Sequence, residues 1–223
     1  MNKTSYTNLS KAWEFIESRA VDEQRSYLQE IRSKVESQGH EQGSAAQASF
    51  LNTLIRLVGA RSIILVGTAA AVETVQIIDA LQGGGQLTVV DSSSAGAAVI
   101  RAIFNDLDDE SDTRMRAVNA SAGVFLPRLN AEDYDLIIVT GDASNYLASY
   151  QQSSRLLKQG GATVFTDMLG FQASDSQGGL LNPVDRDAKT LELRKLLSMV
   201  DDDETTDSTL IPVGTGMLIA THH

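Results

Sequence analysis

The amino-acid sequence predicts an α/β fold with a doubly wound, mostly parallel sheet of seven strands that ends in an antiparallel hairpin. Between residues 62 and 166, five short apolar runs alternate with segments of helical periodicity, which is typical of parallel strands joined by helices. Near the C-terminus, two further apolar runs are joined by Gly214, Thr215 and Gly216, a connection too short for a crossover helix. The last two strands are therefore predicted to pair antiparallel.

The composition limits the class of protein. The chain has 223 residues, with 18 lysine and arginine residues against 29 aspartates and glutamates, and no cysteine. The net charge of −11 argues against nucleic acid and anionic membranes as partners. The lack of cysteine excludes disulfides, thiolate chemistry and cysteine-based zinc sites. No apolar stretch resembles a membrane span or a signal peptide, so we expect a cytoplasmic protein.

The N-terminal part of the chain is predicted to be helical. Residues 11–37 carry apolar side chains at spacings of three and four, which predicts one or two amphipathic helices packed outside the main fold. A polar loop follows, and residues 46–58 carry another apolar face. Trp13 and Phe15 could pack on a second subunit or within the same chain, and we expect a homodimer.

Strands and helices alternate after Gly59. The predicted strands cover residues 62–66, 87–90, 115–119, 136–139 and 162–166. The predicted helices cover residues 70–81, 94–107, 123–129, 145–157 and 187–200. The glycines of the sequence KQGG are expected to cap the helix over residues 145–157. The segment from Gly170 to Asp185 is longer than most connections, so it is a candidate lid over an active site.

The candidate site residues follow the strands, because ligands of open parallel sheets bind beyond the carboxyl ends of the strands. Gly67 and Thr68 follow the first predicted strand, where the next helix directs its N-terminal amides toward an anion. Small residues in such a turn serve packing equally well. Asp91 ends the second strand, 24 residues after Gly67, where an acid can bind ribose hydroxyls; it also suits the cap of the next helix. Together, the two positions favour a nucleoside-containing ligand.

Two further carboxylates follow later strands. Asp142 comes after the fourth predicted strand, in a loop that faces the proposed ligand, and Asp167 comes after the fifth. A carboxylate at the end of a central strand requires a partner, so Asp167 either binds a substrate or a cation, or caps the segment that follows. Tyr146 is expected to pack rather than to take part in catalysis.

Six collinear segments resemble a known family. They read GSAAQASFLNTLIRLVGARSIILVGTAAAVETV, VDSSS, NASAGVFLPRL, YDLIIVTGDASNYLASY, LLKQGGATVFTDML and LIPVGTGMLIA. In this order and spacing they resemble the bacterial O-methyltransferases of family 3, related to catechol and caffeoyl-CoA O-methyltransferases. These are class I S-adenosylmethionine-dependent enzymes with a Rossmann-like fold. The resemblance runs from Gly43 to Ala220, and it implies a helical extension over residues 1–42 and a methyltransferase domain over residues 43–223.

The resemblance implies S-adenosylmethionine as the cofactor. Gly67 and Thr68 would hold the methionine part of this cofactor, and Asp91 would hold its ribose. Ser121 and Ala122 would lie beside its adenine. The complete set of cofactor residues, in which Asp142 would bind the ammonium group, is Gly43, Leu65, Gly67, Thr68, Glu73, Asp91, Ser92, Ser121, Ala122 and Asp142.

The sequence departs from the family at the cofactor turn. Leu65 replaces the acid that the family has at the end of the first strand, and Glu73 replaces a serine. Ala69 and Ala71 replace glycines. Alanine can hold the same backbone where φ stays negative, so these changes crowd the turn without necessarily closing it.

The metal positions also differ from those of the family. Its metal-dependent members bind magnesium through the oxygens of two aspartates and an asparagine; the corresponding residues here are Thr140, Asp167 and Met168. Ala143 replaces the lysine that serves the family as a base or an orienting cation. We therefore expect no bound metal, with Asp142 and Asp167 as the catalytic groups that orient or deprotonate the acceptor.

The sequence thus favours an S-adenosylmethionine-dependent O-methyltransferase that acts without metal on a small hydroxylated acceptor. The alternative is a non-catalytic relative that binds S-adenosylmethionine or S-adenosylhomocysteine, or that serves as a dimeric interaction module, since a fold does not fix function. A nicotinamide-dependent dehydrogenase is disfavoured by the terminal hairpin and by the absence of a Gly-x-Gly-x-x-Gly pattern.

Overall fold

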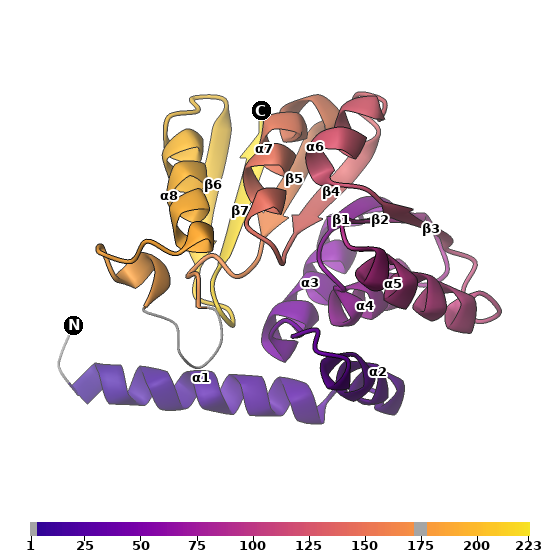
Figure 1. Cartoon of the computed structure of the whole chain (residues 1–223), viewed down its shortest axis with the longest axis horizontal. Helices are drawn as coiled ribbons and strands as arrows, with labels where there is room; N and C mark the ends of the chain where they lie inside the picture. The colour runs from indigo at the N-terminus through magenta and orange to yellow at the C-terminus, as the bar shows by residue number, and fades with distance from the viewer. Residues whose placement is uncertain (1–3, 172–177) are drawn as a thin grey trace.

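The computed structural model describes residues 4–171 and 178–223. Its centre is a seven-stranded sheet with the order β3-β2-β1-β4-β5-β7-β6 (Figure 1). The strands are β1 (Ser62–Val66), β2 (Gln86–Asp91), β3 (Arg114–Asn119), β4 (Tyr134–Val139), β5 (Leu157–Phe165), β6 (Thr206–Ile211) and β7 (Met217–His222). Strands β1 to β5 pair in parallel, and β7 is antiparallel to both β5 and β6. The predicted sheet with its C-terminal hairpin is confirmed.

Helices cover both faces of the sheet. One face carries α2 (Ser26–Ser37), α3 (Ala45–Val58), α4 (Ala71–Leu81) and α5 (Ser94–Leu107). The other face carries α6 (Ala122–Phe125), the 3₁₀ turn η1 (Leu126–Arg128), α7 (Ser144–Leu156) and α8 (Ala188–Asp201). No helix among the described residues has both the length and the apolar character that a membrane span requires.

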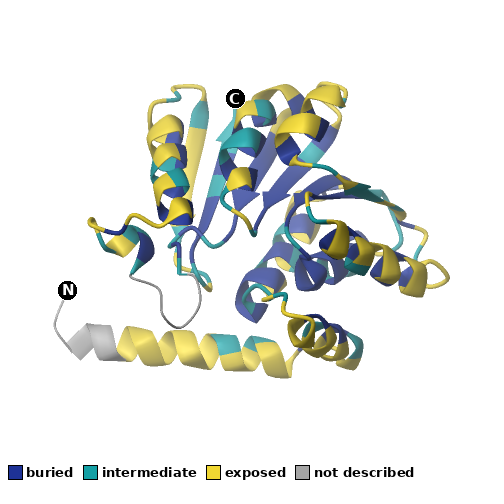
Figure 2. Cartoon of the chain, in the orientation of Figure 1, coloured by how far each residue is buried: buried dark blue, intermediate teal, exposed yellow. Residues whose placement is uncertain are grey.

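The central strand β1 shows why the sheet needs two helical layers. Successive side chains of a strand point to opposite faces. Ile63 and Leu65 accordingly belong to the hydrophobic cluster on one face, and Ile64 and Val66 belong to the cluster on the other. All four are essentially inaccessible to solvent, and the central strands are dark blue in Figure 2. The continuous apolar run in the sequence thus corresponds to a strand that is buried on both faces.

The two N-terminal helices differ in how they pack. Helix α2 contributes Leu28, Ile31 and Val35 to the main core, whereas α1 (Thr4–Asp22) is largely exposed (Figure 2). Helix α1 is attached to the N-terminus of α3 through Glu17, whose carboxylate accepts hydrogen bonds from the Ser44 hydroxyl at 2.5 Å and from two backbone amides of α3. The expectation that these helices pack outside the main fold is therefore wrong for α2.

The glycines after α7 do not cap that helix, contrary to the sequence-based prediction. Helix α7 ends at Leu156, and β5 begins at the next residue. Gly160 has a φ of +77° and lies inside β5, where the pairing with β4 is irregular. Glycine reaches this left-handed conformation without steric cost, and the irregular pairing requires it. The two glycines therefore serve the sheet and not the helix.

The predicted lid is described in part. Residues 172–177 of the segment from Gly170 to Asp185 lie outside the described residues. After them comes a 3₁₀ turn, η2 (Gly179–Leu181), whose Leu180 amide donates to the Leu169 carbonyl at 2.9 Å. The lid remains a prediction.

Candidate active site

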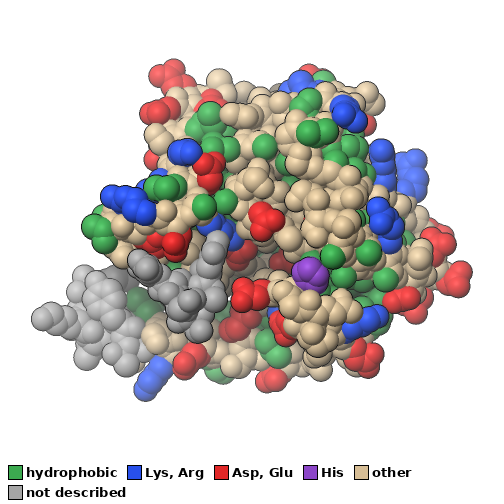
Figure 3. All heavy atoms as spheres, viewed as in Figure 1, with side chains coloured by type: hydrophobic (Ala, Val, Ile, Leu, Met, Phe, Trp, Pro, Cys, Tyr) green, Lys and Arg blue, Asp and Glu red, His purple; other side chains and the backbone are tan. Residues whose placement is uncertain are grey.

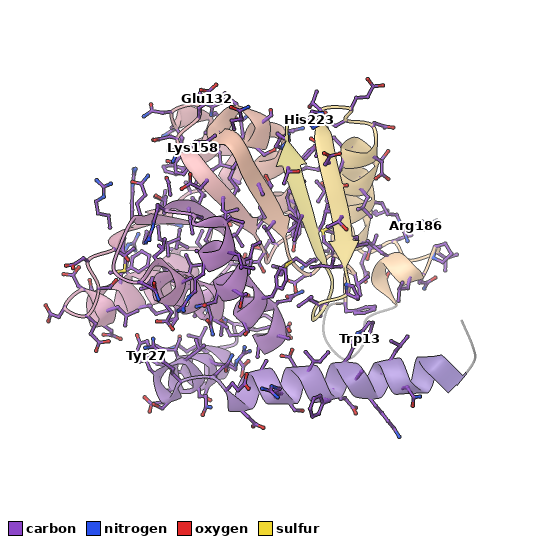
Figure 4. The ribbon with its side chains drawn as sticks, turned by 180° about the vertical axis from the view of Figure 1, so that it is seen from behind. Trp13, Tyr27, Glu132, Lys158, Arg186 and His223 are labelled. Atoms are coloured by element: carbon purple, nitrogen blue, oxygen red, sulfur yellow. The ribbon has the colours of Figure 1, made fainter. Side chains whose placement is uncertain are left out.

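A cavity of about 560 Å³ opens at the C-terminal ends of β1, β4 and β5. Residues 39–44, the turns after these strands and the first turn of α8 line it. Figure 4 shows Glu132 and Lys158 near the N-terminal ends of β4 and β5, which are the ends away from the cavity. Figure 3 shows several acidic side chains in the middle of the face, between α1 and the part that carries the sheet. The cavity thus lies at the edge where ligands of this architecture bind.

The turn between β1 and α4 is held by Asp91, the last residue of β2. Its Oδ2 accepts a hydrogen bond from the Ala69 amide at 2.7 Å, and its Oδ1 accepts one from the Ser93 amide at 2.7 Å. Burial raises the pKa of the Asp91 carboxyl, while these two amides lower it. Asp91 is 2% exposed and does not line the cavity. The structure therefore shows its structural role at the turn, and ribose binding remains a prediction.

Ala69 has a backbone conformation that differs from the sequence-based expectation. Its φ is +49°, in the left-handed region, whereas the sequence argument assumed a negative φ for the alanines of this turn. The hydrogen bond from its amide to Asp91 helps to hold this conformation. The turn therefore keeps a glycine-like backbone although its glycine is missing.

Gln42, which the sequence analysis did not single out, caps helix α4. Ala70 at the N-cap position provides no side-chain hydrogen bond. The Gln42 Oε1 instead accepts hydrogen bonds from the Ala71 amide at 3.0 Å and the Val72 amide at 3.2 Å. Its Nε2 donates to the Ala69 carbonyl at 3.0 Å. Two amides that could bind a ligand anion are thus bonded to a side chain of the same protein.

Glu73 is a buried acid in the first turn of α4. It is 2% exposed, and burial raises the pKa of its carboxyl to about 7, with Asp167 acting in the same direction. Its Oε1 lies only 2.1 Å from the position that a Cβ on Gly43 would occupy. A side chain at position 43 would require this carboxyl group to move, and both residues line the cavity.

Asp167 is surrounded by hydrogen-bond donors. The Thr215 hydroxyl donates to its Oδ1 at 2.6 Å, and the Thr140 hydroxyl donates to its Oδ2 at 3.1 Å. The Lys189 Nζ lies 3.7 Å from the same Oδ2. The φ of Asp167 is +54°, so the backbone after β5 is strained at this residue. The carboxylate, predicted to be catalytic, is thus held in one orientation at the edge of the cavity.

Lys189 is a site residue that the sequence analysis missed. It comes from the first turn of α8, and its Nζ lies 5.4 Å from the ring centroid of Tyr146. Tyr146 is fully buried and donates its hydroxyl to the Thr166 carbonyl at 3.0 Å, which confirms its predicted packing role. Lys189 belongs to no motif and does not follow a strand, so the sequence contained no local signal for it.

The structure brings together five of the predicted site residues. Those that line the cavity are Gly43, Thr68, Glu73, Asp142 and Asp167. Asp142 is exposed, and its amide donates to the Thr68 hydroxyl at 3.4 Å. The other predicted cofactor residues do not line the cavity; they are Leu65, Gly67, Asp91, Ser92, Ser121 and Ala122. Leu65 is fully buried in the core, and its role at the cofactor remains a prediction.

The three positions that bind magnesium in metal-dependent relatives do not form an oxygen-rich site here. Met168 is fully buried in the hydrophobic cluster with α7 and α8. The Thr140 hydroxyl donates to Asp167, which leaves this aspartate as the one carboxylate of the three positions. Within residues 4–171 and 178–223, no group of three or more His, Cys, Asp or Glu side chains could hold a metal ion.

Comparisons with known proteins give the same family over nearly the whole chain. A family model described as O-methyltransferase matches residues 17–223. A protein of Mycolicibacterium smegmatis, described as "Putative O-methyltransferase", is 30% identical over 176 residues, which cover 78% of this chain and 80% of that protein.

Solved structures share the fold. An O-methyltransferase from Bacillus cereus in complex with SAH matches with a TM-score of 0.77 at 19% identity, over 96% of this chain and 99% of that chain. A structure from Staphylococcus aureus, described as a "putative caffeoyl-CoA O-methyltransferase", matches with a TM-score of 0.75 at 15% identity, over 91% and 95% of the chains. With the family match over residues 17–223, they confirm the predicted resemblance: the chain belongs to the O-methyltransferase family.

Proposed function

We propose that this protein transfers a methyl group from S-adenosylmethionine to a small hydroxylated acceptor without a divalent metal. The observation that carries the proposal is the cavity at the strand ends, whose lining among the described residues includes four acidic side chains and one lysine. Membership of the O-methyltransferase family supplies the reaction class. The Bacillus cereus relative in complex with SAH supports the cofactor.

The charge and the size of the cavity fit S-adenosylmethionine. This cofactor carries two positive groups, a sulfonium and an ammonium. The acidic side chains that line the cavity among the described residues are Glu41, Glu73, Asp142 and Asp167. Glu73, whose pKa burial raises to about 7, is only partly ionised at neutral pH. The volume of about 560 Å³ lies within the range of roughly 300 to 1,000 Å³ that is usual for small-molecule sites.

The carboxylate of the cofactor also needs donors, and the first turn of α4 has them. The amides of Ala71 and Val72 are bonded to Gln42, a neutral side chain from a loop. Hydrogen bonds to an ionised acceptor are about twice as strong as those between neutral groups, so a ligand carboxylate can displace the Gln42 side chain. The residues present therefore fit the cofactor once this side chain rotates.

The residues of the chain bind the cofactor and orient the acceptor. When bound, S-adenosylmethionine supplies an electrophilic methyl group for an in-line displacement, which requires a nucleophile held in the correct orientation. Asp142 binds the ammonium group. Asp167, fixed by Thr140 and Thr215, orients the acceptor hydroxyl through its carboxylate.

The donor set supports independence of metal. Magnesium prefers an octahedron of oxygen ligands, and a buried methionine with one carboxylate and one hydroxyl is a poor substitute. Among the described residues that line the cavity, the cationic side chain near these positions is Lys189.

A second candidate function is binding of S-adenosylmethionine or S-adenosylhomocysteine without turnover. The amides of Ala69, Ala71 and Val72 are all bonded to side chains of the protein, so the turn is complete without a ligand. Because these amides have acceptors without a cofactor, this arrangement of the turn favours the function without catalysis.

We further propose that the protein is a cytoplasmic homodimer without nucleic-acid or membrane partners, with residues 1–42 as an extension of the domain over residues 43–223. Its net charge of −11 supports the absence of anionic partners. Helix α1 exposes Trp13 (labelled in Figure 4), Phe15 and Ile16, which are 43%, 67% and 51% exposed. Exposed apolar side chains of this size are typical of a surface that packs on a second subunit.

Titration calorimetry tests the proposal, with S-adenosylmethionine and S-adenosylhomocysteine as ligands. We expect saturable binding of both below millimolar concentration, and weaker binding to Asp142→Asn because the ionic contact to the ammonium is lost. Asp133→Asn, an exposed aspartate before β4, is the matched control and should bind as the parent protein does. No binding at millimolar concentration would overturn both functions, and binding without methyl transfer to any of a catechol panel would favour the second.

A further inference from the structure

Lys189 is a buried cation without a hydrogen-bond partner among the described residues. It is 7% exposed and lines the cavity. Its Nζ lies 3.7 Å from the Asp167 Oδ2, which is within the range of an ion pair but longer than a hydrogen bond. An ammonium group has three N–H donors. Among the described residues, the Lys189 Nζ is not one of the fully buried polar atoms that lack a partner, so it reaches the open space of the cavity, where its donors are available to a ligand.

The surrounding structure fixes the position of this ammonium group. Tyr146 lies beneath it, with the ring centroid 5.4 Å from the Nζ. The start of α8 is anchored by Asp185, which is 1% exposed and accepts hydrogen bonds from the Asp187 amide at 2.8 Å and the Gly179 amide at 2.9 Å. A preorganised donor of this kind binds a ligand without a large loss of side-chain entropy.

The charge around Lys189 defines what it can bind. Among the described residues that line the cavity, it is the only lysine or arginine, and the acidic ones are Glu41, Glu73, Asp142 and Asp167. Besides the amides at the start of α4, Lys189 is the group among these described residues that attracts a negatively charged ligand atom. Asp167 itself already has the Thr140 and Thr215 hydroxyls as donors, so Lys189 is not required to satisfy that carboxylate.

We propose that Lys189 is a catalytic residue that binds the acceptor oxygen in its ionised form, as a metal cation would. The acceptors are therefore acidic hydroxyl compounds, namely phenols or enols. This assignment rests on the proposed function. The acceptor enters with its hydroxyl donating to Asp167, and it gives this proton to solvent as Lys189 binds the oxygen. Its oxyanion then forms a bond to the methyl carbon while the carbon–sulfur bond breaks, and the electron pair of that bond stays on sulfur, which becomes a neutral thioether.

The test uses 4-nitrophenol, whose ionised form absorbs visible light, as a probe of the full-length protein. At a pH above the probe's own pKa, titration of the parent protein should show saturable binding of the ionised probe. Lys189→Met should weaken that binding about tenfold, because a charge-assisted hydrogen bond is lost. Lys189→Arg keeps the charge and should retain most of the affinity. Circular dichroism checks that each variant is folded.

Two controls make the result specific. Lys195→Met removes an exposed lysine from the same helix and should leave the affinity for the probe unchanged. 4-Nitroanisole has no hydroxyl group, and its binding should be the same in the parent protein and in Lys189→Met. Equal affinity of the ionised probe for the parent protein and Lys189→Met, or no binding to either, would overturn the proposal.

Calorimetry with S-adenosylhomocysteine on the same proteins separates this inference from the proposed function. If the parent protein and Lys189→Met both bind S-adenosylhomocysteine but do not differ toward the ionised probe, the role of Lys189 fails while the cofactor site stands. If neither protein binds S-adenosylhomocysteine but they differ tenfold toward the probe, the methyltransferase function fails and the anion site at Lys189 stands.

Discussion

The side-chain oxygen of Gln42 lies 3.0 Å from the amide nitrogen of Ala71, so a loop residue from before α3 caps the helix that follows β1. The same oxygen accepts a hydrogen bond from Val72. These amides stand at the positive end of the helix dipole, which favours negative ligand groups. An external carboxylate at this site must therefore replace Gln42.

Gln42→Ala should lower stability and raise ligand affinity. We expect the free energy of unfolding to fall by about 1 kcal/mol, because an N-terminal cap is lost. The affinity for S-adenosylhomocysteine should rise, since no internal group competes for the two amides. Urea unfolding and calorimetry measure the two effects, with the exposed Gln151→Ala of α7 as control. A fall in affinity instead would mean that Gln42 contacts the ligand.

Asp91→Ala should destabilise the protein strongly. The variant leaves the amides of Ala69 and Ser93 without their acceptor and removes one of the bonds that hold the left-handed Ala69. We expect the free energy of unfolding to fall by about 3 kcal/mol. The control is Asp109→Ala, an exposed residue after α5. Unchanged stability together with weaker S-adenosylhomocysteine binding would show instead that Asp91 binds ribose.

Glu73→Gln should make stability less dependent on pH. Burial raises the folded-state pKa of Glu73 from 4.5 to about 7, so the folded state holds this proton while the unfolded state releases it. The parent protein therefore loses stability as the pH rises from 4.5 through 7, by about 3 kcal/mol from this group.

The Glu73→Gln variant is compared with the parent protein by urea unfolding at pH 4.5 and pH 8. Glutamine does not ionise, so the variant should gain stability relative to the parent at the higher pH. Glu30→Gln, an exposed glutamate of α2, is the matched control. A constant difference between Glu73→Gln and the parent at both pH values would contradict the buried, proton-holding state.

Glu17→Ala should release helix α1. The carboxylate accepts hydrogen bonds from the Ala45 and Ala46 amides at 2.6 and 3.1 Å, and from the Ser44 hydroxyl. We expect a loss of about 2 kcal/mol in the free energy of unfolding and faster amide hydrogen exchange in α1. Glu14→Ala, exposed on the same helix, should change neither quantity. Exchange in α1 at the parent rate would show that other contacts hold the helix.

The fold could be predicted because its signals are local. The apolar run of β1 is buried on both faces, and the short connection at Gly214 to Gly216 permits only an antiparallel pair. The start of β5 was missed because the conformation of Gly160 belongs to an irregular pairing with β4. The residues around Gly160 in the sequence do not indicate this tertiary contact.

The site was predictable where a residue follows a strand or lies in a segment of the family resemblance, as Gly43 and Glu73 do. Asp142 and Asp167 line the cavity as expected. Gln42 and Lys189 reach it from a polar loop and from a helix, and the folded chain alone brings these segments to the strand ends. The positive φ of Ala69 could not be predicted either, because it accompanies a hydrogen bond to Asp91 on another strand.

Methyl transfer to a catechol panel, with magnesium or with EDTA, tests the central claim most directly. The assay follows the labelled methyl group from S-adenosylmethionine to the acceptor. We predict equal rates in magnesium and in EDTA, because Thr140, Asp167 and Met168 do not form a magnesium site and Lys189 provides the cation. Transfer that requires magnesium, or no transfer under either condition, would contradict it.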